Sequence, residues 1–107
     1  MIFDILYASV IKGELLLIDG GMCRWHLRKD GQLTIYEIIA TCKGSGTEML
    51  DYLKTVPNAS SIFAKCPEHL TANIWYAKRG FVCVGEEFTK SGERILLWEL
   101  LLHGGID

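Results

Sequence analysis

Long apolar runs, a basic excess and a basic cluster within residues 1–6 are all missing from this sequence of 107 residues. No apolar run reaches the roughly 18–20 residues of a membrane-spanning helix, so we expect no transmembrane segment. The formal net charge is −2, whereas surfaces that bind nucleic acid or membranes carry a basic excess. Residues 1–6 include an early acid and no basic cluster, unlike a signal peptide. These absences favour a cytoplasmic protein.

Internal repeats, linkers and low-complexity tracts are missing too. With 107 residues, 50% of them apolar, the chain can form one domain over residues 1–107 with a single core. The four cysteines, Cys23, Cys42, Cys66 and Cys83, are scattered along the chain. We expect small buried thiols in a reducing compartment rather than a disulfide framework.

Motifs for a metal or a covalent nucleophile are also lacking. The pairs Cys23-x-x-His26 and Cys66-x-x-His69 have a ligand-like spacing. However, Cys23 and His26 fall in a predicted strand, where residues three apart point to opposite faces. We therefore predict no metal site, and no Ser-His-Asp or Cys-His arrangement can be read from the sequence.

The periodicity of apolar residues predicts both helices and strands. The predicted order is a helix at 3–12, strands at 14–19, 22–28 and 32–40, a helix at 44–56, a strand at 60–65, a helix at 71–79, and strands at 81–87 and 94–102. Asp30-Gly31 and Lys90-Ser91-Gly92 are hairpin signals. This order indicates an α/β (α+β) domain with a single mixed, mostly antiparallel sheet flanked by helices.

The most informative stretch runs from Thr41 to Leu50. Gly44 and Gly46 form a Gly-x-Gly turn between a predicted strand and a predicted helix. Glycines let the backbone turn tightly, and the first helical turn then offers unpaired N–H groups and a positive dipole end. This combination makes a phosphate site, although a plain loop before a helix is the alternative.

A second motif, Ala72-Asn73-Ile74-Trp75-Tyr76-Ala77-Lys78-Arg79-Gly80-Phe81, follows about thirty residues later. Together the two motifs resemble the GNAT family of N-acetyltransferases, over roughly residues 14–100. Thr41 stands where the family motif opens with Gln or Arg, and the loop before the glycines is shorter than usual. The resemblance implies the acyl-CoA N-acyltransferase (GNAT) fold and acetyl-CoA as the acetyl donor.

The resemblance also implies which residues bind the cofactor. They are Ile38, Ile39 and Ala40 along the pantetheine arm where two strands splay apart, Thr41 at the motif opening, and Lys43, Gly44, Ser45, Gly46 and Thr47 around the pyrophosphate. Asn73 and Tyr76 contact the cofactor arm. Asn73 has an equal alternative as a helix-start residue that satisfies its own backbone.

Three side chains are candidates for catalysis. The resemblance makes Tyr76 the general acid that protonates the leaving thiolate, with a purely packed tyrosine as the alternative. It also makes a glutamate on the strand at 32–40 a base, and Glu37 alternates there with Leu33, Ile35 and Ile39. A carboxylate in such an apolar row needs a partner or has a raised pKa. His26 is a second candidate base, or part of a solvated face.

The hairpin register decides what lies opposite Glu37. If Asp30-Gly31 is a two-residue turn, Arg24 faces Glu37 and the two form an ion pair. A three-residue turn places Cys23 there instead.

We therefore expect an N-acetyltransferase that moves an acetyl group from acetyl-CoA to an amine by direct attack. The chain is short for this family, which suits a protein or peptide amine better than an enclosed metabolite. Such compact chains also look like those carried by phages and mobile elements. The alternatives are an inactive CoA-binding or protein-interaction module, and a homodimer formed through the apolar segment from Leu96 to Leu102 or its burial within one chain.

Overall fold

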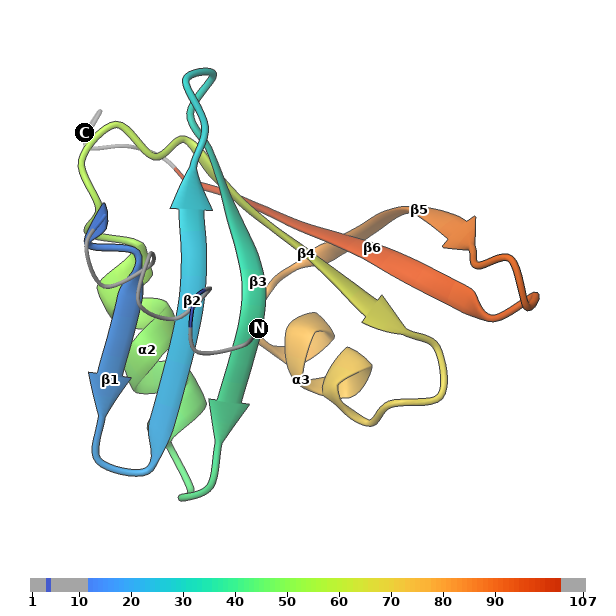
Figure 1. Ribbon diagram of the computed structural model, residues 1–107, viewed down its shortest axis with the longest axis horizontal. Helices are drawn as coiled ribbons and strands as arrows, with labels where there is room; N and C mark the ends of the chain where they lie inside the picture. The colour runs from blue at the N-terminus through green and yellow to red at the C-terminus, as the bar shows by residue number, and fades with distance from the viewer. Residues whose placement is uncertain (1–3, 5–11, 103–107) are drawn as a thin grey trace.

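The computed structural model describes residue 4 and residues 12–102 of the chain. Its elements are β1 (Leu15–Ile18), β2 (Gly21–Leu27), β3 (Gln32–Ala40), α2 (Ser45–Leu53), β4 (Ser61–Pro67), α3 (Ala72–Lys78), β5 (Val82–Phe88) and β6 (Arg94–Leu101). The strands form one 6-stranded sheet in the order β1-β2-β3-β4-β6-β5 (Figure 1). Only β3 and β4 pair in parallel, so the predicted mixed, mostly antiparallel sheet is confirmed.

The order of elements within residues 12–102 also matches the prediction. The helix predicted at 3–12 lies outside the described residues apart from Asp4 and Lys12. Within the part that the structure describes, no helix is both long enough and apolar enough to cross a bilayer.

The two helices share one hydrophobic core with the sheet. Helix α2 lies against β1, β2 and β3, and α3 lies against β4 and β5. The apolar face of α2 is buried through Met49, Leu50 and Leu53, at the helical spacing that the sequence shows. Burying each such side chain contributes about 1.5–3 kcal/mol. The core thus holds α2 against the face of the sheet that includes β3, the strand before α2 in the chain.

The apolar C-terminal strand is an inner strand. β6 pairs with β4 on one side and with β5 on the other. Leu96 and Leu100 pack against the core, and Trp98 is buried in it. Because β6 has a neighbour on each side, pairing of β6 across a dimer is wrong. Most of its side chains are only partly buried and Leu101 is 67% exposed, so a homodimer that packs on this apolar segment stays a prediction.

The hairpin between β2 and β3 combines a three-residue turn with a later shift of register, and the sequence does not reveal both. At the turn the register is that of a three-residue loop, with Leu27 opposite Leu33 and the Arg28 N–H donating to Gln32 O at 2.8 Å. A register shift then follows, since Trp25 faces Ile35 but Arg24 faces Glu37. Tyr36 lies between Ile35 and Glu37 on β3 and is therefore the extra residue of a β-bulge.

This bulge corrects the prediction for Glu37. Leu33 and Ile35 are buried, but the next core residue on β3 is Ile38. An extra residue moves every later side chain to the opposite face of a strand. The predicted row of Leu33, Ile35, Glu37 and Ile39 is therefore broken after Ile35, and Glu37 lies on the face away from the core.

β3 and β4 separate after a short paired segment. They pair from Gln32 to Ile35 and from Ser61 to Ala64, although β3 continues to Ala40. Figure 1 shows β4 diverging from β3 toward the C-terminal ends of both strands. The β4-facing edge of β3 is thus without a strand partner from residue 36 onward, within the part of the chain that the structure describes.

Candidate active site

A pocket of about 410 Å³ lies beside the unpaired end of β3. It is lined by Ile38, Ala40, Cys42, Gly44, Gly46, Thr47, Thr71, Ala72, Trp75 and Tyr76. Six of these were predicted to bind a cofactor, namely Ile38, Ala40, Gly44, Gly46, Thr47 and Tyr76. Both sequence motifs therefore contribute to one cavity, although they lie about thirty residues apart in the chain.

The glycine turn leaves backbone donors free at this pocket. Gly44 is the N-cap of α2 and has a left-handed backbone, with φ 88°. The N–H of Ser45 donates to Cys42 O at 3.1 Å. Within the described residues the N–H groups of Gly46 and Thr47 have no hydrogen-bond partner. Two donors and the positive end of α2 are thus available to an anion.

Close packing of the two helices at the pocket depends on Gly46. A Cβ atom built there would lie 3.2 Å from Cζ2 of Trp75, which belongs to α3. Trp75 in turn packs edge-on against Tyr76, with ring centroids 5.2 Å apart. Trp75 was not predicted as a site residue, because its contact with Gly46 joins two helices and leaves no local signal.

Tyr76 is buried and yet reaches the pocket. Its ring stacks on Trp98 at 6.2 Å and meets Phe81 edge-on at 5.0 Å, and only 4% of the residue is exposed. Within the described residues its hydroxyl has no hydrogen-bond partner. Among the described residues, Nε1 of Trp25 is the side-chain polar atom that is both fully enclosed and without a hydrogen-bond partner. The unpartnered Tyr76 hydroxyl is therefore not fully enclosed, and it opens to the pocket that Tyr76 lines.

The environment of Tyr76 keeps its phenol protonated. Burial raises the pKa of Tyr76 above its ordinary value, and the thiols of Cys66 and Cys23 add to the rise. Burial likewise raises the pKa of Cys23 to about 12. The hydroxyl is therefore a hydrogen-bond donor over the whole physiological pH range.

Glu37 has a partner on the neighbouring strand. Nε of Arg24 donates to Oε1 of Glu37 at 3.0 Å, and the side chains are 21% and 39% exposed respectively. The Arg24 guanidinium also lies 4.8 Å from the ring centroid of Tyr36, the bulge residue. The ion pair that is one of the two expectations for Glu37 is thus present. Glu37 does not line the pocket, but it directly precedes Ile38, which does.

His26 lies farther along β2 and is also paired. Its Nδ1 is 2.6 Å from Oε2 of Glu14, and it faces Thr34 across the hairpin. Thr34 belongs to the segment of β3 that still pairs with β4. His26 is therefore separated from the opening between β3 and β4, and it does not line the pocket.

Asn73 is used within the protein. Its amide nitrogen donates to the carbonyls of Pro67 and Leu70, both at 2.8 Å, and its Oδ1 accepts from Nε1 of Trp98 at 2.8 Å. Asn73 does not line the pocket. Its side chain anchors the start of α3 to β4 and β6, which agrees with the structural alternative for this residue.

The remaining predicted cofactor residues also lie outside the pocket lining. They are Ile39, Thr41, Lys43 and Ser45. The Thr41 N–H donates to Gly20 O at 2.7 Å, and the Ser45 hydroxyl donates to Asp19 O at 3.4 Å. Both residues thereby fasten the glycine turn to the β1–β2 connection.

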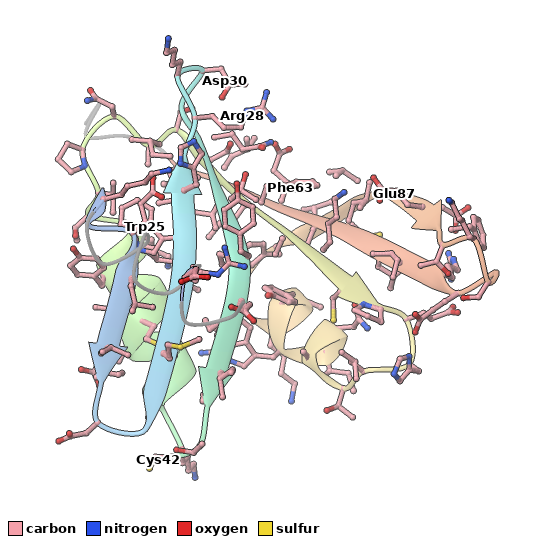
Figure 2. All side chains as sticks on the ribbon, viewed as in Figure 1. Trp25, Arg28, Asp30, Cys42, Phe63 and Glu87 are labelled. Atoms are coloured by element: carbon pink, nitrogen blue, oxygen red, sulfur yellow. The ribbon has the colours of Figure 1, made fainter. Side chains whose placement is uncertain are left out.

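The cysteines divide into two groups. Cys23 and Cys66 are buried free thiols, as predicted. Cys42 and Cys83 are free but exposed, which contradicts the expectation that the thiols are buried. Cys42 lies two residues beyond the end of β3, in the loop that leads to α2 (Figure 2), and it lines the pocket. Exposure follows from its place in the loop between β3 and α2.

The chain matches no protein-family model and no curated protein sequence. Its structure is similar to solved acetyltransferase structures. A GNAT-family acetyltransferase from Bacillus cereus has a TM-score of 0.78 and 15% identity, over 92% of this chain and 78% of that one. A ribosomal-protein-alanine N-acetyltransferase from Escherichia coli has a TM-score of 0.69 and 17% identity, over 95% and 79%.

A third similar structure contains acetyl coenzyme A. It is a Bacillus anthracis protein described as a streptothricin acetyltransferase, with a TM-score of 0.69 and 20% identity. The match covers 78% of this chain but only 56% of the length of the Bacillus anthracis protein. At sequence identities of 15–20%, these structural similarities show the fold of this chain. The protein therefore has the fold of the GNAT acetyltransferases.

Proposed function

We propose that this protein is an N-acetyltransferase that moves an acetyl group from acetyl-CoA to an amine. The observation that carries the proposal is the shape of the pocket. It joins free amides at the start of α2, an unpartnered tyrosine hydroxyl on α3 and a strand edge without a neighbour. The free amides suit a phosphate, the tyrosine hydroxyl suits a sulfur atom, and the unpaired strand edge suits a chain that contains amide groups.

Donor binding uses the backbone. The N–H groups of Gly46 and Thr47 hold the pyrophosphate at the positive end of α2, and Lys43 adds a nearby positive charge. The pantetheine arm lies along residues 38–40 in place of the missing strand, because its amides match the unpaired edge of β3. The complex of the Bacillus anthracis structure with acetyl coenzyme A supports this donor.

The transfer is a direct displacement on the thioester. The amine nitrogen attacks the carbonyl carbon, and a backbone N–H of the unpaired β3 edge stabilises the oxyanion. A C–N bond forms, the C–S bond breaks, and the sulfur takes a proton from the Tyr76 hydroxyl.

Glu37, directly or through water, removes the proton from the amine. Its place beside Ile38, next to the opening, favours it over His26. The ion pair with Arg24 is compatible with this role, because 39% of the Glu37 side chain is exposed and reachable. In a second candidate function the Arg24–Glu37 pair has only a structural role, and the protein binds coenzyme A without catalysis.

Three classes of acceptor amine come into question: a protein, a peptide or a small molecule. The similar structures include enzymes described as acting on a ribosomal protein, on streptothricin and on an aminoglycoside, so they do not narrow the class. Acetylation profiling with protein lysates and with free amines separates the possibilities. We propose a protein or peptide amine, and modification of free small amines alone would contradict it.

Calorimetric titration with acetyl-CoA tests the donor site. We expect micromolar binding by the wild type and no measurable binding by Gly46→Glu, because the added side chain meets Trp75 and places a negative charge among the amide donors. Ser91→Glu, on the β5–β6 turn, adds the same charge away from the pocket and serves as the matched control. Equal binding by both variants would contradict the proposed site.

A further inference from the structure

Arg79 reaches from the end of α3 to the beginning of α2. It is the C-cap residue of α3, and its Nη1 donates to Oγ1 of Thr47 at 3.1 Å. Thr47 lies in the first turn of α2 and lines the pocket. A guanidinium is therefore held against a residue of the pocket lining, in the same helical turn as the free N–H groups of Gly46 and Thr47.

The other three arginines of the chain are paired with carboxylates. Arg24 pairs with Glu37, Arg28 with Asp30, and Arg94 with both Glu68 and Glu86. Within the described residues Arg79 alone among the arginines has no carboxylate partner. Its unpaired charge is thus not a general property of the arginines in this protein.

The position of this charge is electrostatically unfavourable by itself. Cations are stabilised near the C-terminus of a helix and destabilised near its N-terminus. The Arg79 guanidinium is close to the C-terminus of its own helix, but its hydrogen bond directs it to the positive end of α2. A cation and a helix N-terminus that face the same space both favour an anion there.

A second observation indicates that a ligand occupies this space. The same pocket contains the hydroxyl of Tyr76, whose residue is 4% exposed and which has no hydrogen-bond partner among the described residues. The hydroxyl opens to the pocket and is unused by the protein, so a ligand that enters the pocket can accept a hydrogen bond from it. The ligand therefore has to combine an anionic end with a hydrogen-bonding part deeper in the pocket.

We propose that Arg79 binds a phosphate oxygen of the pyrophosphate of the acyl donor, together with the amides of Gly46 and Thr47. This inference rests on the proposed function for the identity of the donor. A guanidinium suits the task because its planar fork donates more than one hydrogen bond to a phosphate. The hydroxyl of Thr47 holds Arg79 in place and is a positioning group.

The matched control for Arg79 is the adjacent residue of the same charge. Lys78 is exposed at the last position of α3, and no hydrogen bond or ion pair joins it to α2 among the described residues. The variants Arg79→Gln and Lys78→Gln remove one positive charge each. Because both residues are exposed, we expect both variants to fold, and thermal unfolding checks this.

Calorimetry with acetyl-CoA and with inorganic pyrophosphate tests the proposal. We expect Arg79→Gln to weaken acetyl-CoA binding about tenfold or more, and Lys78→Gln to change it less than about threefold. Arg79→Lys retains the charge without the planar fork and falls between them. The salt dependence of binding is also shallower for Arg79→Gln than for Lys78→Gln, because a phosphate contact is lost.

Each other outcome has a definite meaning. Equal acetyl-CoA binding by Arg79→Gln and Lys78→Gln overturns the role of Arg79 and leaves the proposed function intact. Binding of pyrophosphate that depends on Arg79, without any binding of acetyl-CoA, supports the anion site and overturns the proposed donor. A wild type that binds neither probe overturns both. Loss of thermal stability without loss of affinity in Arg79→Gln shows a bridge between helices only.

Discussion

At the scale of single residues, two side chains near the pocket combine packing with a polar group. Tyr76 contributes its ring to the core and its hydroxyl to the pocket. Glu37 is held by Arg24 while part of it remains exposed. For both residues a conservative substitution can remove the polar function and leave the packing unchanged, so structure and chemistry can be tested separately.

Tyr76→Phe separates the two roles of Tyr76. Because the hydroxyl has no hydrogen-bond partner in the described residues, we expect the free energy of unfolding to change by less than about 1 kcal/mol. We expect kcat for acetyl transfer to fall about 100-fold, since a positioned general acid contributes about that much or more. Urea unfolding and steady-state kinetics measure the two effects. Unchanged kcat would show that Tyr76 only packs.

Glu37→Gln and Arg24→Gln break the same ion pair from opposite sides. The pair is partly exposed, so we expect each variant to lose only about 0.5 kcal/mol of stability. If Glu37 is the base, Glu37→Gln lowers kcat about 100-fold, whereas Arg24→Gln frees the carboxylate and keeps kcat within about threefold. The same small loss of activity in both variants would favour the role as a structural ion pair.

At the scale of elements, the β2–β3 hairpin is fastened to the start of β4 at one glycine. Gly31 is buried with φ 94°, and its carbonyl accepts a hydrogen bond from the Ser60 N–H at 2.8 Å. A Cβ atom at Gly31 would lie 2.5 Å from Oγ of Ser60. The glycine therefore sets both the turn and the distance between the hairpin and the strand that pairs in parallel with β3.

Gly31→Ala and Gly92→Ala distinguish these two contributions. Gly92 also has a left-handed backbone, with φ 90°, but no atom lies within 4 Å of a Cβ built there. We expect Gly92→Ala to cost about 1 kcal/mol through the backbone alone, and Gly31→Ala to cost about 1 kcal/mol more through the contact with Ser60. Thermal or urea unfolding measures both. Equal costs would mean that Ser60 rotates away without penalty.

At the scale of the whole molecule, the core contains several weak acids. Burial raises the pKa of Cys23 from 9.0 to about 12, and it also raises the pKa values of Cys66 and Tyr76. These groups keep their protons in the folded state at a pH where the unfolded chain loses them. By linkage, ionisation at high pH favours the unfolded chain.

Stability is therefore expected to fall on the alkaline side. It is fully present below about pH 9, the ordinary pKa of the thiols, and is lost as the pH rises toward the folded-state values. The free energy of unfolding falls by about 1.4 kcal/mol per pH unit for each group that is ionised in the unfolded chain and still protonated in the folded one. Urea unfolding at pH 7, 9 and 10 measures it. Cys23→Ala should show a shallower decline, and an identical slope would contradict burial of this thiol.

Much of the architecture can be predicted from the sequence, because its signals are local. The strand at Gln32–Ala40, the apolar face of α2 and the left-handed Gly44 each depend on residues close together in the chain. Alternation of side chains and the special backbone of glycine are sufficient for these features. Six of the residues that line the pocket follow instead from the resemblance to the GNAT family.

Other features depend on contacts between distant segments, and only the tertiary structure decides them. The bulge at Tyr36 turns Glu37 away from the core and opposite Arg24, although the turn itself has the other register. Asn73 is bound by Trp98 of another strand, and Arg79 reaches Thr47 of another helix. Each of these outcomes depends on packing across 13 or more residues of sequence, which local patterns do not encode.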